Sequence, residues 1–166
     1  LGNFRGTTRI RVEKSPEAIA VTCEDQSLTY RELDQKANQL ANYLRAHGVG
    51  RETIVALYMN RSLEMIVALL AILKAGGAYL PLDPDYPPER LAALVEDARP
   101  ALVLTERAVL QSREETFQAV FDPAQRQGVG RIVVLDAAEF DSLVVPDPVV
   151  PGPVAAAAPG SLAGSL

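Results

Sequence analysis

The sequence predicts an α/β fold, in which helices flank a mostly parallel sheet. Short apolar runs of strand length alternate with longer segments whose apolar residues recur every three or four positions. The resulting order, β-α-β-α-β-α-β, favours parallel strands joined by right-handed crossovers. The chain has 166 residues, 48% of them hydrophobic, which is enough to bury one core. Aromatic residues make up only 5% and Trp is absent, so we expect aliphatic side chains to fill that core.

The N-terminal part of the chain predicts a strand after an ambiguous start. Residues 9–14 are compatible with a short helical turn, which Pro16 would end. Residues 17–23 alternate apolar with smaller or polar side chains, as a strand does. Residues 24–27 predict a turn, and residues 28–30 predict either a short strand or the entry to a helix.

The first long helix begins at a capping box. Thr29 and Glu32 have the T-x-x-E spacing that starts a helix at Tyr30. Gly48 is placed to end it as a left-handed cap, with His47 in the last turn. One face of this helix is apolar at 3.6-residue spacing. Its members are Leu33, Ala37, Leu40, Ala41 and Leu44.

The next strand and helix are apolar throughout. Residues 53–59 form a continuous apolar run, typical of a strand buried on both faces. Ser62 is a natural N-cap, with Glu64 in the first turn. The helix that follows is apolar almost all round through Leu73, which predicts burial in a large domain or against a partner.

Residues 73–84, LKAGGAYLPLDP, predict a helix end, a glycine joint and a strand. Lys74 complements the negative end of the helix dipole, and Gly76 suits a left-handed cap. Residues 78–82 suit a strand covered on both faces. However, Pro81 predicts that the strand ends there or lies at a sheet edge. No residue of this stretch looks catalytic from its local pattern.

A third helix and two more strands follow a proline-rich turn. Pro88 suits the first helical position, and the apolar face comprises Leu91, Leu94, Val95 and Ala98. Residues 101–104 and 131–135 are expected to be buried strands. Between them the sequence predicts a helix over residues 108–116 and then a polar loop through residues 125–128.

Composition excludes several classes of protein. The net charge of −5 is mild and no basic stripe is present, which argues against nucleic acid and anionic membranes as partners. Cys23 is the only cysteine, so no intrachain disulfide can form, and its apolar surroundings predict a small buried hydrophobe. The N-terminus has no signal-peptide pattern. The longest apolar run, residues 65–73, is about half of a membrane span, so we expect a soluble, cytoplasmic chain.

Phosphate-binding loops are not recognisable in the sequence. Neither G-x-G-x-x-G after a strand nor a P-loop ending in Gly-Lys-Ser/Thr is present. Residues 128–130 read G-V-G but precede a strand, which predicts a turn. Residues 74–77 lack the following helix that a phosphate cradle requires, which again favours a helix cap.

Asp83 and Asp85 are the strongest candidates for a polar site. They follow a predicted strand at its carboxyl end, where α/β folds place ligands, and they could bind a metal or act as a base. The favoured interpretation is that they are turn residues that cap the Pro88 helix. Neither His47, the only histidine, nor Cys23 belongs to a Ser-His-Asp, Cys-His or metal-binding arrangement. The other acidic pairs are Glu24-Asp25, Glu96-Asp97 and Glu114-Glu115.

Taken together, these motifs resemble the adenylation domains of nonribosomal peptide synthetases, which belong to the adenylate-forming (AMP-binding) superfamily. Residues 27–33, SLTYREL, resemble the first core motif of that family, and residues 73–83 resemble the second. Four further segments are similar to the family's sequences, namely SPEAIAV (15–21), NQLANYL (38–44), RSLEMI (61–66) and YPPERL (86–91). The resemblance covers roughly residues 12–136 and implies a partial N-terminal subdomain of the adenylate-forming fold.

The resemblance implies amino-acid activation. The family condenses an amino acid with ATP, with Mg²⁺, to an aminoacyl adenylate and releases pyrophosphate. It then transfers the acyl group to the phosphopantetheine thiol of a carrier domain. The implied partners are the remainder of the adenylation domain and the neighbouring condensation and carrier domains.

The resemblance also implies that the catalytic parts lie elsewhere. The family's phosphate loop follows a Leu-Ala-Tyr segment, and residues 159–163 resemble only the approach to it. The amino-acid pocket, the ribose-binding aspartate and the C-terminal lysine would lie downstream. No catalytic, cofactor-binding or metal-binding residue is therefore carried over to any position. We expect this chain to be an inactive fragment of a ligase, with ATP, Mg²⁺ and phosphopantetheine used by the complete enzyme.

Three segments are predicted. Residues 1–14 are a poorly defined N-terminal segment, in which residues 1–11 depart from the family. Residues 15–143 form a truncated α/β adenylation subdomain, with an uncertain stretch over 106–130. Residues 144–166 form an extended tail rich in Pro, Ala and Gly. Two other functions stay open: a non-catalytic interaction module from a truncated domain, and a fragment of an acyl-CoA ligase.

Overall fold

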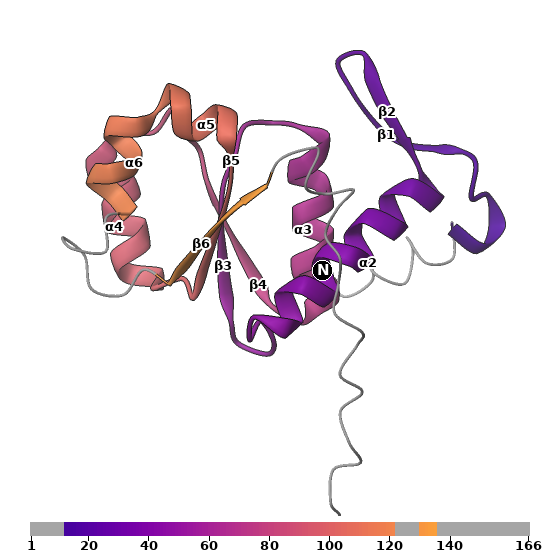
Figure 1. Ribbon diagram of the computed structural model, residues 1–166, viewed down its shortest axis with the longest axis horizontal. Coiled ribbons are helices and arrows are strands. Elements are labelled where there is room, and N and C mark those ends of the chain that lie inside the picture. The colour runs from indigo at the N-terminus through magenta and orange to yellow at the C-terminus, as the bar shows by residue number, and fades with distance from the viewer. Residues whose placement is uncertain (1–11, 122–129, 136–166) are drawn as a thin grey trace, which may run out of the picture.

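The computed structural model describes residues 12–121 and 130–135 (Figure 1). A parallel four-stranded sheet lies between two layers of helices. Its strands are β3 (Ile54–Tyr58), β4 (Ala78–Leu82), β5 (Leu102–Glu106) and β6 (Arg131–Leu135). Helices α2 (Tyr30–Ala46) and α3 (Leu63–Ala75) cover one face. Helices α4 (Pro88–Ala98), α5 (Arg107–Ser112) and α6 (Glu114–Phe121) cover the other. The predicted fold class is confirmed.

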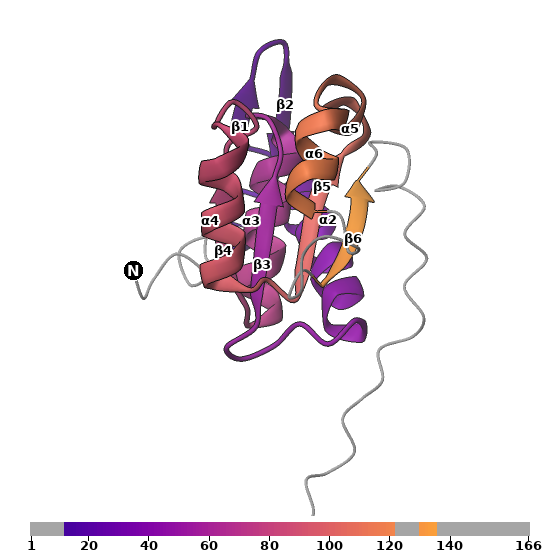
Figure 2. The same ribbon diagram turned by 90° about the vertical axis from the view of Figure 1, so that its left-hand side faces the viewer.

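The strand order is β4-β3-β5-β6. The chain passes from β3 outward to β4, then crosses β3 to reach β5 and β6, so the direction of winding reverses between β3 and β5. Figure 2 shows α4 and α6 on one side of the sheet and α2 and α3 behind it. The carboxyl ends of all four strands therefore meet at one edge, with the reversal at its centre.

Helix α2 follows the predicted cap and apolar face. The Thr29 hydroxyl accepts a hydrogen bond from the Glu32 amide at 3.2 Å, and the Glu32 carboxylate accepts one from the Thr29 amide at 2.9 Å. These bonds to Thr29 hold the pKa of Glu32 below its ordinary value. All five predicted face residues are buried. Gly48 has φ +87°, as the predicted left-handed cap requires.

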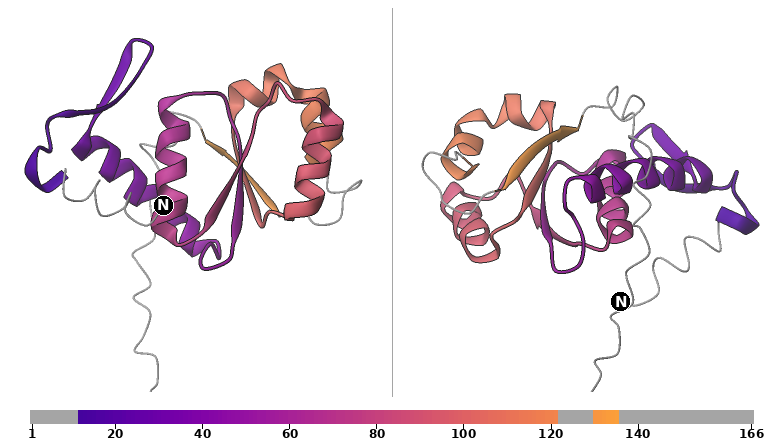
Figure 3. Two further views of the ribbon diagram at one scale, coloured as in Figure 1. Left: turned by 180° about the vertical axis from the view of Figure 1, so that it is seen from behind. Right: turned by 60° about the horizontal axis from the view of Figure 1, so that its bottom comes forward.

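Strands β1 (Ile19–Cys23) and β2 (Gln26–Thr29) form a separate antiparallel hairpin. Figure 3 shows it projecting beyond the N-terminal end of α2. The predicted turn over residues 24–27 is wrong in its second half, because Gln26 and Ser27 pair with β1 and only Glu24 and Asp25 form the turn. The helical turn predicted before Pro16 is seen over residues 12–14.

Of the helix and strand boundaries that differ from the prediction, two differ most in their structural context. The single helix expected over residues 108–116 is two helices, α5 and α6, which break at Arg113. Strand β5 runs on to Glu106, two residues past the predicted end. Both differences arise near the carboxyl edge of the sheet, where tertiary contacts override local propensity.

Strand β4 is an edge strand, as Pro81 indicates. Among the described residues no strand pairs with its outer side, and Ala78, Tyr79 and Pro81 are exposed. The expectation that residues 78–82 are covered on both faces is therefore wrong. An apolar sequence alone does not distinguish a central strand from an edge strand whose second face is open.

The core has two clusters, one on each face of the sheet. Aliphatic side chains of α2, α3 and the strands fill the first, as composition predicts. The second contains an aromatic group that composition did not predict. Tyr58 lies 5.2 Å from Phe121 and 5.9 Å from Phe117, measured between ring centroids. Leu91 and Val95 of the predicted α4 face are buried in the second cluster.

Some of the sequence predictions fall outside the described residues. They concern residues 1–11, the loop at 125–128, the first two positions of G-V-G at 128–130, and the tail at 144–166.

Candidate functional site

The crevice between the carboxyl ends of β3 and β5 is the topological switch point of the sheet. Open α/β sheets bind their ligands at this place. Here the first turn of α3 meets the end of β5. The Ser62 hydroxyl donates a hydrogen bond to Glu106 Oε1 at 2.6 Å and accepts one from the Met65 amide at 3.1 Å. One side chain thus caps α3 and ties it to β5 across the crevice.

Glu106 is a half-buried carboxylate at this junction. Burial raises its pKa, the Ser62 hydrogen bond opposes this, and the nearby Glu64 carboxylate adds to the rise. The Glu106 carboxyl group therefore holds its proton more tightly in the folded chain than in the unfolded chain. Stability must then fall as pH rises from the ordinary carboxyl pKa through the raised one, and it levels off above that.

We expect Glu106→Gln to stabilise the chain at neutral pH and to have no such effect near pH 4, which is about the ordinary pKa of a glutamate. Glutamine keeps an acceptor for Ser62 and removes the buried charge. The check is the urea midpoint of both proteins across that pH range. Glu96→Gln, on the exposed side of α4, controls for the loss of one negative charge. A difference that grows as pH falls would contradict this assignment.

A cleft of about 430 Å³ lies beside the crevice. The loop after β3 forms one wall and the loop after β4 forms the other. The floor is apolar and includes Leu57, Met59 and Leu82. Asn60, Arg61, Asp83 and Asp85 bring the polar groups to its lining.

Within this cleft Asp83 and Asp85 are turn residues, as favoured from the sequence. Asp83 Oδ1 accepts a hydrogen bond from the Asp85 amide at 2.9 Å, and the Asp83 carbonyl accepts one from the Tyr86 amide at 3.0 Å. Asp85 forms an ion pair with Arg113, at the break between α5 and α6. The predicted cap on the Pro88 helix is wrong, because Pro87 is the N-cap and no side chain caps it.

The LKAGGAY segment performs a structural task. Gly76 takes the left-handed conformation, with φ +96°, that ends α3. At Gly77 a Cβ would lie 2.9 Å from Val49 Cγ1 and 3.1 Å from the Thr53 carbonyl oxygen, so a side chain here would force these neighbours to shift where the chain turns into β4. The helix cap predicted over residues 74–77 is confirmed.

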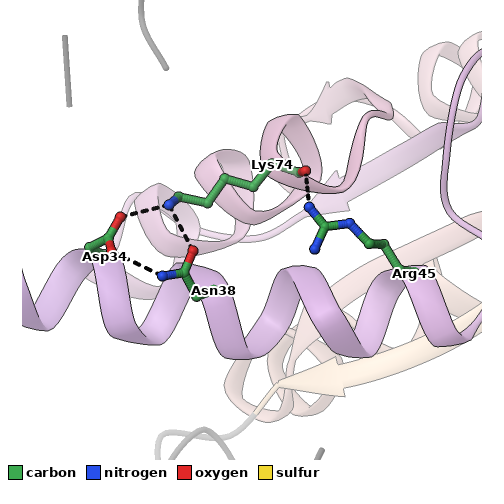
Figure 4. A network of polar contacts seen from close by, with 4 residues as sticks. All are labelled: Asp34, Asn38, Arg45 and Lys74. Atoms are coloured by element: carbon green, nitrogen blue, oxygen red, sulfur yellow. Dashed lines mark hydrogen bonds and ion pairs between the residues drawn. The ribbon is translucent and has the colours of Figure 1, made fainter. Parts of the chain in front are cut away.

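Lys74 fastens α3 to α2 (Figure 4). Its ammonium group donates to Asp34 Oδ1 at 2.6 Å and to Asn38 Oδ1 at 2.8 Å. Asn38 also donates to the other oxygen of Asp34, at 2.9 Å, and Arg45 donates to the Lys74 carbonyl. The Lys74 and Asp34 side chains are only 24% and 23% exposed, so water screens this pair less than a surface pair.

We expect a double-mutant cycle on Lys74→Met and Asp34→Asn to give a coupling energy of about 1–2 kcal/mol, between the values for exposed and buried pairs. The control is the Arg31–Glu17 pair, which has the same 2.6 Å separation but side chains 54% and 72% exposed. Its coupling should stay below about 0.5 kcal/mol. Urea denaturation measures both cycles, and equal couplings would contradict the role given to burial.

The remaining candidates from the sequence form no site. His47 Nδ1 lies 2.8 Å from the Tyr43 carbonyl oxygen, at the end of α2. Cys23 is half-buried, where full burial was expected, and its Sγ lies 3.9 Å from the Arg61 carbonyl oxygen. Across residues 12–121 and 130–135, no three His, Cys, Asp or Glu side chains cluster to hold a metal ion. None of the helices in those ranges is both long and apolar enough to span a membrane.

Two features of the switch point were not predicted from the sequence. The Ser62–Glu106 bond joins residues 44 positions apart, and only the strand order brings them together. Tyr58 and Thr105 are register partners on β3 and β5, and each buries a hydroxyl that has no hydrogen-bond partner among the described residues. Burial also raises the pKa of Tyr58. The sequence shows polar residues at these strand ends, but it does not show which strands pair.

The family is established by a family model. The model described as AMP-binding enzyme matches residues 8–163. The chain belongs to the AMP-binding enzyme family. Bacitracin synthase 2 of Bacillus licheniformis is 56% identical over 96 residues, which cover 58% of this chain and 4% of that protein. This member of the AMP-binding family thus spans a small share of the curated relatives it matches.

Solved structures agree on the fold. A nonribosomal peptide synthetase, FmoA3, in its α-methyl-L-serine-AMP-bound form matches with a TM-score of 0.67 and 31% identity, over 80% of this chain and 14% of that one. The N-terminal domain of FACL13 from Mycobacterium tuberculosis matches with a TM-score of 0.71 and 23% identity, over 88% of this chain and 37% of that domain. The second likeness shows the fold alone.

Proposed function

We propose that this chain is part of an amino-acid-activating adenylation domain of a nonribosomal peptide synthetase. The complete domain would condense an amino acid with ATP to an aminoacyl adenylate and release pyrophosphate. It would then transfer the acyl group to the phosphopantetheine thiol of a carrier domain. The observation that carries the proposal is the 56% identity over 96 residues to bacitracin synthase 2. The FmoA3 structure, which holds α-methyl-L-serine-AMP, supports it.

We assign a structural role, and no catalytic one, to the polar residues of the cleft and to the glycines that end α3. The cleft side chains Asp83 and Asp85 are used in a turn and an ion pair, and the glycines at 76–77 are used in a helix end. We therefore assign no step of the reaction to these residues. We propose that the groups that bind nucleotide and amino acid come from other parts of the synthetase.

The same proposal covers how this chain is divided into segments and which domains of the synthetase lie beside it. Residues 15–143 would form one subdomain, residues 1–14 its leading segment, and residues 144–166 an extended connection. The remainder of the adenylation domain would pack on the subdomain, and neighbouring condensation and carrier domains would belong to the same synthetase. The length of the relatives supports this, since the chain covers only 4% of bacitracin synthase 2 and 2% of gramicidin S synthase 2 of Brevibacillus brevis.

Amino-acid-dependent exchange of pyrophosphate into ATP tests the proposal. The chain alone should give no exchange above background. Mixed with the region of bacitracin synthase 2 that follows its 96 matched residues, it should give exchange that requires an amino acid. Turnover by the chain alone, or none by a folded mixture, would overturn the proposal.

A further inference from the structure

We draw no further inference here: the strongest candidate, the cleft of about 430 Å³ between the loops after β3 and β4, belongs to the site already described, and its Arg61 and Asp83 side chains are exposed to water, so nothing in the structure shows which ligand or chain segment covers it.

Discussion

Gly130→Ala should unfold most of the chain's cooperative structure at low urea concentration. A Cβ at this position would lie 2.8 Å from Ala101 Cα and closer still to the Ala101 carbonyl carbon and oxygen. These are backbone atoms at the start of β5, and they cannot move aside as a side chain can. The Gly130 amide donates to the Pro100 carbonyl at 3.0 Å, so the close approach is what sets β6 beside β5.

We expect this substitution to cost more than about 4 kcal/mol, in the range reserved for steric conflict that the structure cannot relieve. The matched control is Gly50→Ala, where a Cβ would meet nothing within 4 Å. That change should stay within about 1 kcal/mol of the parent. Urea denaturation measures both. A Gly130→Ala chain as stable as Gly50→Ala would show that β6 does not begin against Ala101.

Leu40→Ala should have the second largest effect. Leu40 is fully buried at the centre of the apolar face of α2, among side chains of α2 and α3. Removing its side chain loses apolar burial and leaves a cavity, which together cost about 3–4 kcal/mol at well-packed sites. The urea midpoint should fall accordingly, with little change in the slope of the transition.

Gln39→Ala on the same helix is the control. Gln39 is exposed, and alanine is at least as good a helix former, so stability should change by less than about 0.5 kcal/mol. If Leu40→Ala were as mild as Gln39→Ala, α2 would not pack on α3 as described. The double-mutant cycle on Lys74 and Asp34 would then also lose its coupling, because the same helix pair carries both.

Local signals predicted the helices of this fold well. The Thr29 capping box, the Ser62 N-cap and the glycine at 76 each act within one turn of the chain, so their geometry follows from neighbouring residues alone. The apolar face of α2 is visible as a 3.6-residue repeat for the same reason. These predictions needed no knowledge of which strands pair.

Features that depend on pairing were predicted less well. An apolar run such as residues 78–82 is compatible with the centre or the edge of a sheet, and only the order β4-β3-β5-β6 decides between them. The Ser62–Glu106 bond likewise requires β5 to lie beside β3. The hairpin of β1 and β2 was hidden because Gln26 and Ser27, polar residues typical of turns, are paired instead with β1.

The candidate site was likewise predicted well where it depends on neighbouring residues and less well where it depends on distant ones. Asp83 and Asp85 were correctly placed at a strand's carboxyl end, and their use in a turn follows from local hydrogen bonds. The partner of Asp85, Arg113, lies 28 residues away at a helix break that the sequence did not reveal.

A segment exchange in a relative tests the central claim most directly. Bacitracin synthase 2 would carry the corresponding residues of this chain in place of its own 96 matched residues, and amino-acid-dependent pyrophosphate exchange would be measured. If this chain is the scaffold of an adenylation domain, exchange should persist within about tenfold, equivalent to about 1.4 kcal/mol, with the same amino-acid preference. A folded chimaera that has lost exchange, or that prefers a different amino acid, would contradict the claim.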